Sequence, residues 1–302
     1  MAYRFEHGEP VGHAARRILD EQVVSILGAL ENPGGPGLAE AVHEARRRSK
    51  KVRALARMFR TPMGEQYAAV NTCFRDAARR LAALRDAQVA VQTFDSLLAA
   101  LPRGLSADTM APVRAELVAR QQHASHDTAD ASAAFEEAAG LVRKGAKRAR
   151  RCSVPDGFGA LASGLGRTYA RTVQDWYACC ADPSSASFHE WRKRIKYHRY
   201  HVDLLRRVDP DFAEVRRDAL HELSDLVGEE HDITVLLQMV LDEPDAFGPV
   251  AARRQLMLVA QRRRAFLRTE AIALGARLTA ESPASLCERW ETAWTVWQLG
   301  PS

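Results

Sequence analysis

Apolar residues recur along this chain at the three- and four-residue spacing of an α-helix, almost without interruption. Between residues 13 and 30 they form one broad stripe, which the segment NPGGPG at 32–37 ends. Val, Ile and Thr do not cluster in alternating runs, so the pattern predicts no strand. We therefore expect an all-α protein.

The helical pattern continues to the C-terminus, and proline or glycine marks most of its interruptions. The helices that we expect after the first are 38–60, 64–100 with a break near residues 85–86, 108–150, 161–180, 188–208, 212–228, 233–241, 249–279 and a last one carrying Trp290, Trp294 and Trp297. Residues 153–159, which include Pro155 and two glycines, read as a linker in the middle of the chain.

The two sides of this linker repeat the same order of a helix, a turn, a basic helix, another helix and a long helix. When the chain is shifted by 146 residues, HEARRRSKKVR at 43–53 falls on HEWRKRIKYHR at 189–199. Arg60 also falls on Arg206, which makes seven identities within 18 positions. We interpret this as an internal duplication of two pseudo-symmetric four-helix bundles, residues 1–152 and 153–302.

The charge of the chain is strongly patterned, although the formal net charge is only +5. Most of the 43 Lys and Arg residues lie in four short segments, 39–60, 143–151, 188–207 and 253–268. Such patterning indicates an anionic partner. The first ten residues resemble no export signal, no run is long enough to span a membrane, and the five cysteines lack CxxC spacing. We expect a cytoplasmic protein with reduced thiols.

The two basic segments each place a continuous cationic stripe beside an apolar stripe of the same helix. The stripes consist of His43, Arg46, Arg47, Lys50 and Arg53, and of His189, Arg192, Lys193, Lys196 and Arg199. Each extends about 15 Å along its helix. Like charges spaced by four residues repel, and no glutamate is interleaved on either face. We therefore expect an anion, or acids on a neighbouring element, to relieve the repulsion. Arg and Lys bind phosphate oxygens well, because guanidinium supplies a planar fork and ammonium a point charge.

These residues resemble a known family. The segments VHEARRRSKKVRALARMF at 42–59 and FHEWRKRIKYHRYHVDLL at 188–205, together with GRTYAR at 166–171, are similar to the signature helices of the CHAD family, the α-helical histidine domain. The resemblance implies two pseudo-symmetric four-helix bundles that bind inorganic polyphosphate through a basic surface or pore, in some members on polyphosphate granules. No ExExK-type strands precede the first bundle, so we expect a member without a triphosphate tunnel enzyme domain.

Carried over to this chain, the resemblance implies that the ten residues of the two stripes contact the polyphosphate. A secondary set could extend the basic surface: Arg16, Arg17, Arg167, Arg171, Arg143, Lys144, Lys147, Arg253, Arg254 and Arg262. We expect no catalytic residue, no metal and no cofactor, since no sequence motif for such chemistry is present.

Two other functions, nucleic-acid binding and metal-dependent phosphate hydrolysis, also fit parts of the sequence. Binding of nucleic acid could use the same cations, but the aromatic residues Phe59, Phe188 and Trp191 fall on the buried stripes and leave no platform for bases. A metal phosphohydrolase of the HD type could use Glu230-His231-Asp232. The repeat argues against it, because Asp86 matches Asp232 while no histidine matches His231. We therefore expect Asp232 to be a buried acid that pairs with a basic residue of the signature helix.

Overall fold

The structure of the protein is a computed structural model, which describes residues 3–32, 37–101, 105–126 and 128–300, and their side chains except at 83–85 and 124–130. Within these ranges it contains helices and no strand, which confirms the all-α prediction. The α-helices are α1 (Val11–Glu31), α2 (Leu38–Met58), α3 (Arg60–Met63), α4 (Gln66–Arg80), α5 (Ala83–Ala99), α6 (Ala111–His126), α7 (Thr128–Ala149), α8 (Gly159–Ala181), α9 (Ser185–Leu205), α10 (Pro210–Asp242), α11 (Val250–Leu278) and α12 (Pro283–Leu299). Two short 3-10 helices, η1 (Asp108–Met110) and η2 (Pro244–Phe247), precede α6 and α11.

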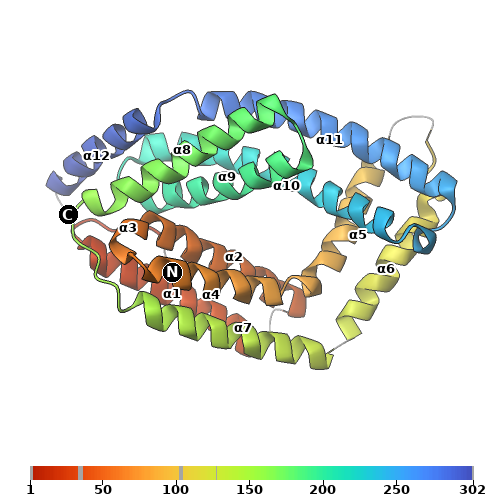
Figure 1. The fold of residues 1–302 in the computed structure, drawn as a ribbon, viewed down its shortest axis with the longest axis horizontal. Coiled ribbons are helices and arrows are strands. Elements are labelled where there is room, and N and C mark those ends of the chain that lie inside the picture. The colour runs from red at the N-terminus through yellow and green to blue at the C-terminus, as the bar shows by residue number, and fades with distance from the viewer. Residues whose placement is uncertain (1–2, 33–36, 102–104, 127, 301–302) are drawn as a thin grey trace.

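The helices pack as two four-helix bundles (Figure 1). In the first, α1 contacts α2 and α7, and α4 contacts the same two helices; in the second, α9 lies between α8 and α10, and α11 contacts both α8 and α10. One continuous hydrophobic core runs through both bundles, with Phe74 and Trp191 among its largest fully buried side chains. The apolar stripes predicted for the two basic helices face this core, since Val42, Leu55 and Phe188 are all buried.

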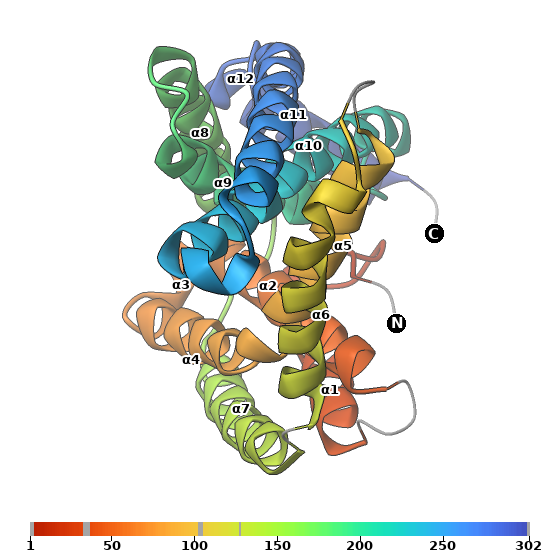
Figure 2. The same cartoon turned by 90° about the vertical axis from the view of Figure 1, so that its right-hand side faces the viewer.

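A second core closes the far end of the molecule. It consists of side chains from α5, α6, the C-terminal part of α10 and the N-terminal part of α11, such as Phe94, Leu117, Leu236 and Leu256. Figure 2 shows α6 running across this end of the molecule, from the second bundle towards α7 of the first. The elements therefore form a ring, with the bundles in direct contact at one end and joined by the second core at the other (Figure 1).

Two close contacts join the second bundle to the C-terminal part of α2. His201 on α9 donates a hydrogen bond from Nε2 to the carbonyl oxygen of Ala54 on α2, at 2.9 Å. Gly164 on α8 lies against the last carbonyls of α2, where a Cβ atom would stand 2.0 Å from the oxygen of Met58. Only glycine allows the two backbones to approach this closely.

Several element boundaries differ from the prediction. The segments predicted as separate helices at 212–228 and 233–241 form one helix, α10, because nothing after Gly228 breaks a helix and an interior glycine costs only about 1 kcal/mol. The break predicted near 85–86 lies at 81–82, and the helix predicted for 108–150 is divided into η1, α6 and α7. The helix boundary near residue 127 lies outside the described residues.

The predicted boundary between 152 and 153 stays a prediction about the sequence repeat. Both cores take side chains from each side of it, so the two halves share their interiors. None of the helices in the described ranges combines the length and the apolar character that crossing a membrane would require.

Candidate anion-binding cavity

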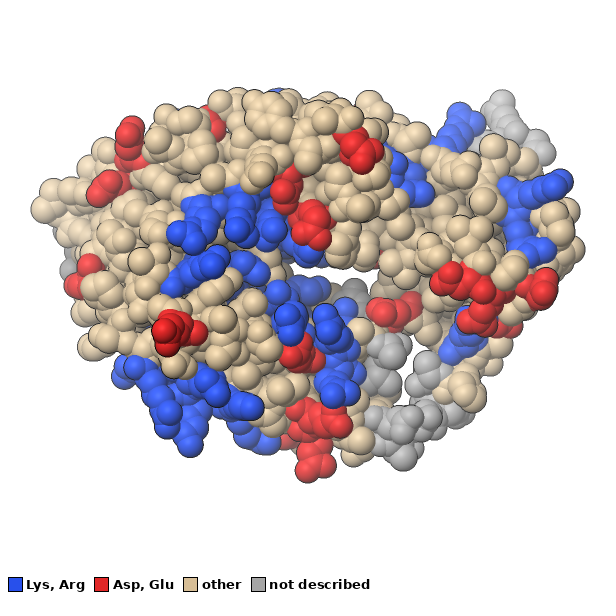
Figure 3. All heavy atoms as spheres, in the orientation of Figure 1, with Lys and Arg blue, Asp and Glu red and all other residues tan. Residues whose placement is uncertain are grey.

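The ring encloses a cavity of about 730 Å³, lined by α2, α5, α9 and α10. Figure 3 shows the molecule hollowed at its middle, with Lys and Arg side chains gathered along the left side of the opening. The six Lys and Arg residues that line the cavity are Arg46, Arg47, Lys50, Arg192, Lys196 and Arg199. All six come from α2 and α9, so the two predicted stripes converge on one wall.

The opposite wall carries acids from α5 and α10, namely Asp86, Asp225, Glu229 and Asp232. Part of their charge is already engaged elsewhere. Glu229 accepts two hydrogen bonds from Arg263, at 2.6 and 2.8 Å, and Asp225 lies 3.1 Å from Nδ1 of His221. The cavity therefore has a cationic side and an acidic side, and the cations are in excess.

Asp232 pairs with the signature helix as predicted, through a 4.0 Å contact with Arg192. Its side chain is 37% exposed, however, so the prediction that it is buried was wrong. The helix α10 carries Asp232 on the cavity face rather than on the face that packs against α11.

The cationic helices also contain local ion pairs that the stripe analysis missed. Glu44 contacts both Arg47 and Arg48, and Glu190 contacts both Lys193 and Arg194. Each glutamate lies three and four residues before its partners, the spacing at which helical side chains meet. The expectation that no glutamate is interleaved with the cations was therefore wrong, although Lys50, Lys196 and Arg199 on the cavity wall are not among these pairs.

Lys196 is a deeply enclosed cation of the cavity. Burial is the largest cause that holds its pKa well below the usual lysine value, and the neighbouring charges of Arg192, Lys50 and Arg199 act in the same direction. Asp232 opposes them in part. An ammonium group in this position gains most from a bound anion, because the anion would offset both the burial and the repulsion.

A pair of histidines adjoins this wall. Nδ1 of His189 on α9 lies 3.4 Å from Nδ1 of His231 on α10, and their rings are 4.8 Å apart. Burial lowers the pKa of His231 to about 3, with Arg192, His189, Lys196 and Lys50 contributing further. The pKa of His189 is also lowered, first by burial and then by Lys193. Both shifts favour the neutral imidazole.

Comparison with known proteins identifies the family. The family described as CHAD domain matches residues 17–241, well over half of the chain. This chain belongs to the CHAD domain family. The crystal structure of the CHAD domain from the plant Ricinus communis shares its fold, with a TM-score of 0.61 and 16% sequence identity over 98% of this chain and 95% of that one. No curated protein matches the sequence.

In this CHAD domain, seven of the ten residues predicted for the two stripes line the cavity, since His43 joins the six cations. The other three lie outside it. Arg53 donates to Asn71 at 3.1 Å and lies over the ring of Tyr197, Lys193 pairs with Glu190, and His189 contacts His231, which lines the cavity. The helical projection placed them on the stripe, but Arg53 turns to α4 and His189 to α10, while Lys193 stays partly exposed beside Glu190 of its own helix.

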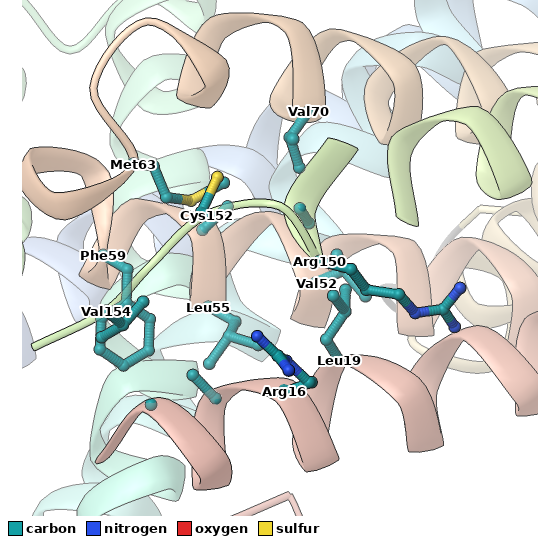
Figure 4. A pocket seen from close by; sticks show the side chains of 14 residues that line it. Arg16, Leu19, Val52, Leu55, Phe59, Met63, Val70, Arg150, Cys152 and Val154 are labelled. Atoms are coloured by element: carbon teal, nitrogen blue, oxygen red, sulfur yellow. The ribbon is translucent and has the colours of Figure 1, made fainter. Parts of the chain in front are cut away.

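None of the secondary candidates lines the central cavity of the CHAD domain. Arg16 borders a small apolar cavity of about 50 Å³ together with Leu19 and Phe59 (Figure 4), and Arg17 pairs with Glu9 and Glu21. Arg143 pairs with Glu31, while Lys144 and Lys147 border a groove at the end of α7. On α11, Arg254 and Arg262 are exposed and Arg253 is half-buried. Arg167 and Arg171 line a separate hollow.

Sequence reasoning missed the polar residues that α5 and α10 bring to the cavity. His221, Asp225 and Glu229 line it from α10, and Gln92, Thr93 and Ser96 line it from α5. The spacing of His221, Asp225, Gly228 and Asp232 would have shown that they share one face of a helix, had α10 been predicted as one continuous helix.

The metal-binding alternative rests on Glu230, His231 and Asp232. Within the described ranges, no group of three or more His, Cys, Asp or Glu side chains is placed to hold a metal ion. His231, the centre of that alternative, has the ring of His189 beside it and cations around it. Such surroundings disfavour a bound cation.

Proposed function

We propose that this CHAD domain binds inorganic polyphosphate in the central cavity and catalyses no reaction there. The observation that supports the proposal is the convergence of six Lys and Arg side chains from α2 and α9 on one wall of a cavity of about 730 Å³. The family to which the chain belongs is associated with polyphosphate. A linear chain of phosphates matches two rows of cations, because each phosphate offers oxygens to guanidinium and ammonium groups alike.

The cavity favours a ligand made of phosphates over a nucleic acid. Recognition of single strands relies on exposed aromatic rings that stack on bases. The aromatic residues of the two cationic helices are buried instead: Phe59, Phe188 and Trp191 are at most 2% exposed, and Tyr200, the aromatic residue on the cavity wall, is 4% exposed. Among the described residues, the cavity lining therefore offers no exposed aromatic ring on which a base could stack.

The test is a titration with polyphosphate of defined length, against RNA and DNA of equal charge. Two variants remove two cations each, Arg47→Gln/Lys50→Gln on α2 and Lys196→Gln/Arg199→Gln on α9. We expect each to weaken polyphosphate binding by at least tenfold, or about 1.4 kcal/mol. Arg262→Gln/Arg277→Gln is the matched control, because it removes two exposed charges from α11 outside the cavity.

Wild-type affinity in both cavity variants would refute the proposal. Tighter binding of RNA or DNA than of polyphosphate would replace it with the nucleic-acid alternative. Circular dichroism of each variant shows whether the helices remain folded, so that lost affinity reflects the lost cations.

The proposal extends to location. We infer a cytoplasmic protein that gathers on polyphosphate granules where a cell forms them. A fluorescent fusion should then colocalise with stained granules, and the Lys196→Gln/Arg199→Gln variant should be diffuse. Equal granule association of the wild type and this variant would refute the inference.

A further inference from the structure

A second cationic hollow lies outside the central cavity, where α2 and α3 meet α8 and α9. Its volume is about 20 Å³. Its charged residues, here called the arginine cluster, are Arg57, Arg60, Arg167, Arg171 and Arg194. The hollow shares no lining residue with the central cavity. Figure 3 shows Lys and Arg side chains gathered on this face, where Figure 1 has α8 above α3 and α4.

The arginine cluster has far more positive than negative charge. Arg194 pairs with Asp175 at 3.2 Å and with Glu190 at 3.8 Å. For the other four arginines, no carboxylate of the described residues lies within 4.0 Å. Ion pairs within the described residues therefore account for Arg194 but not for the other four guanidinium groups of the cluster.

Two arginines of the cluster are held over tyrosine rings. The guanidinium of Arg57 lies 4.1 Å from the ring centre of Tyr197, and that of Arg60 lies 4.9 Å from the ring of Tyr67. Stacking of this kind uses the face of a guanidinium and leaves its N–H edge available. Nε of Arg57 is buried and donates to no group in the described part of the chain. A buried donor without an acceptor costs free energy, and an anion bound beside it would recover that cost.

The close packing of α8 on α2 brings these arginines together. Gly164 allows α8 to lie against the carbonyl oxygens of Arg57 and Met58. Arg167 and Arg171 follow one and two turns later on α8, and both are exposed. Carbonyls at a helix end attract one nearby cation, but they do not balance five.

We propose that the arginine cluster binds a single phosphate group. Five guanidinium groups around a small, open hollow suit a compact, doubly charged oxyanion, which accepts several hydrogen bonds from planar donors at once. A hollow of about 20 Å³ encloses neither a polyphosphate chain nor a whole phosphate group, so the phosphate would lie at its mouth, against the exposed Arg167 and Arg171. The site is independent of the function proposed for the central cavity. The phosphate group is that of free orthophosphate or the end of a longer phosphate chain.

The test uses the full chain and inorganic orthophosphate, followed by calorimetry and by ³¹P line broadening. The variant Arg167→Gln/Arg171→Gln changes two exposed side chains of α8, so the fold should be retained. We expect one orthophosphate per wild-type chain and at least tenfold weaker binding in this variant. Arg262→Gln/Arg277→Gln, with the same loss of charge, should bind as the wild type does.

A second titration distinguishes the two sources of phosphate and separates this proposal from the first. In Lys196→Gln/Arg199→Gln, orthophosphate should bind as in the wild type even though long polyphosphate binds weakly. If Arg167→Gln/Arg171→Gln also weakens long polyphosphate, the cluster holds a chain end; if it weakens orthophosphate alone, the ligand is free phosphate. Equal orthophosphate affinity in the cluster variant and in the control, or no binding to the wild type, would overturn the proposal.

Discussion

His201 is a buried imidazole that holds the two cationic helices together. Its Nε2 donates to the carbonyl oxygen of Ala54, and its ring is fully buried. Burial is the main reason that its pKa is lowered to about 4. The folded protein favours the neutral imidazole. The stability of the contact between α2 and α9 therefore depends on pH.

Replacing His201 by Gln should make the protein less sensitive to acid. In the unfolded chain the imidazole binds a proton near pH 6.5, whereas in the folded protein it does so only near pH 4. The stabilisation from the neutral ring is therefore complete above pH 6.5 and is lost as pH falls towards 4, by about 2 kcal/mol at pH 5. Urea unfolding at pH 7.5 and pH 5 should show a smaller difference in His201→Gln than in the wild type. The exposed His123→Gln serves as control, and an unchanged difference in His201→Gln would contradict the assignment.

His231 should make polyphosphate binding stronger in acid. Its pKa of about 3 in the free protein reflects burial and the cations around it. A bound polyanion would offset these cations and raise the pKa, so that binding takes up a proton. Affinity should therefore increase as pH falls from 7.5 to 5, and His231→Gln should reduce that increase. Retention of the full increase in His231→Gln would place the titrating group elsewhere, with His43 as the next candidate on the cavity wall.

Two helical glycines differ in the space available for a side chain. Gly164 faces the backbone of α2, where a Cβ atom would stand 2.0 Å from an oxygen, whereas Gly228 of α10 has nothing within 4 Å of that position. The same change should have opposite effects. Gly164→Ala should lower the free energy of unfolding by about 2 kcal/mol or more, because backbone atoms must move apart. Gly228→Ala should raise it by about 0.5–1 kcal/mol, because alanine is a better helix former.

Urea unfolding of the two variants at one pH measures both effects, and the wild type serves as the common reference. Destabilisation in both variants would mean that Gly228 meets a neighbour in solution. Near-neutral behaviour of Gly164→Ala would mean that α8 can move away from α2 at little cost, and the arginine cluster would then lack its fixed geometry.

At the scale of helices, periodicity predicted the helices well, but it did not predict which helices pack together. The apolar stripes of α2 and α9 follow from local spacing, and their buried faces match the prediction at Val42, Leu55 and Trp191. The continuity of α10 was missed because Gly228 reads as a stop signal, although nothing after it breaks a helix. The sequence therefore revealed the cations together with Asp86 and Asp232, and missed Asp225 and Glu229, which α10 adds to the cavity.

At the scale of the whole molecule, the ring determines which cations belong to one site. Arg46 and Arg192 come together in the cavity although they lie far apart in the sequence, while Arg143 and Arg254 point elsewhere on equally basic helices. Charge density along the chain could not separate these cases. The cations are separated by the tertiary fold. The second core holds α5 and the C-terminal part of α10 together, and both helices line the cavity.

Chain length and salt test the ring as a binding site. The lining cations of α2 run from His43 to Lys50 and those of α9 from Arg192 to Arg199, so each row is about 10 Å long. A long polyphosphate contacts both rows, whereas pyrophosphate reaches only part of one. We expect at least tenfold tighter binding of long chains than of pyrophosphate, with a steeper fall of affinity as salt rises, because more counterions are released.

The variant Lys196→Gln/Arg199→Gln should reduce the salt dependence of affinity for the long chain and change it little for pyrophosphate held at the α2 row. Calorimetry at two salt concentrations measures both quantities. Equal affinity and equal slopes for short and long chains would indicate a compact pocket in place of a groove formed by two helices.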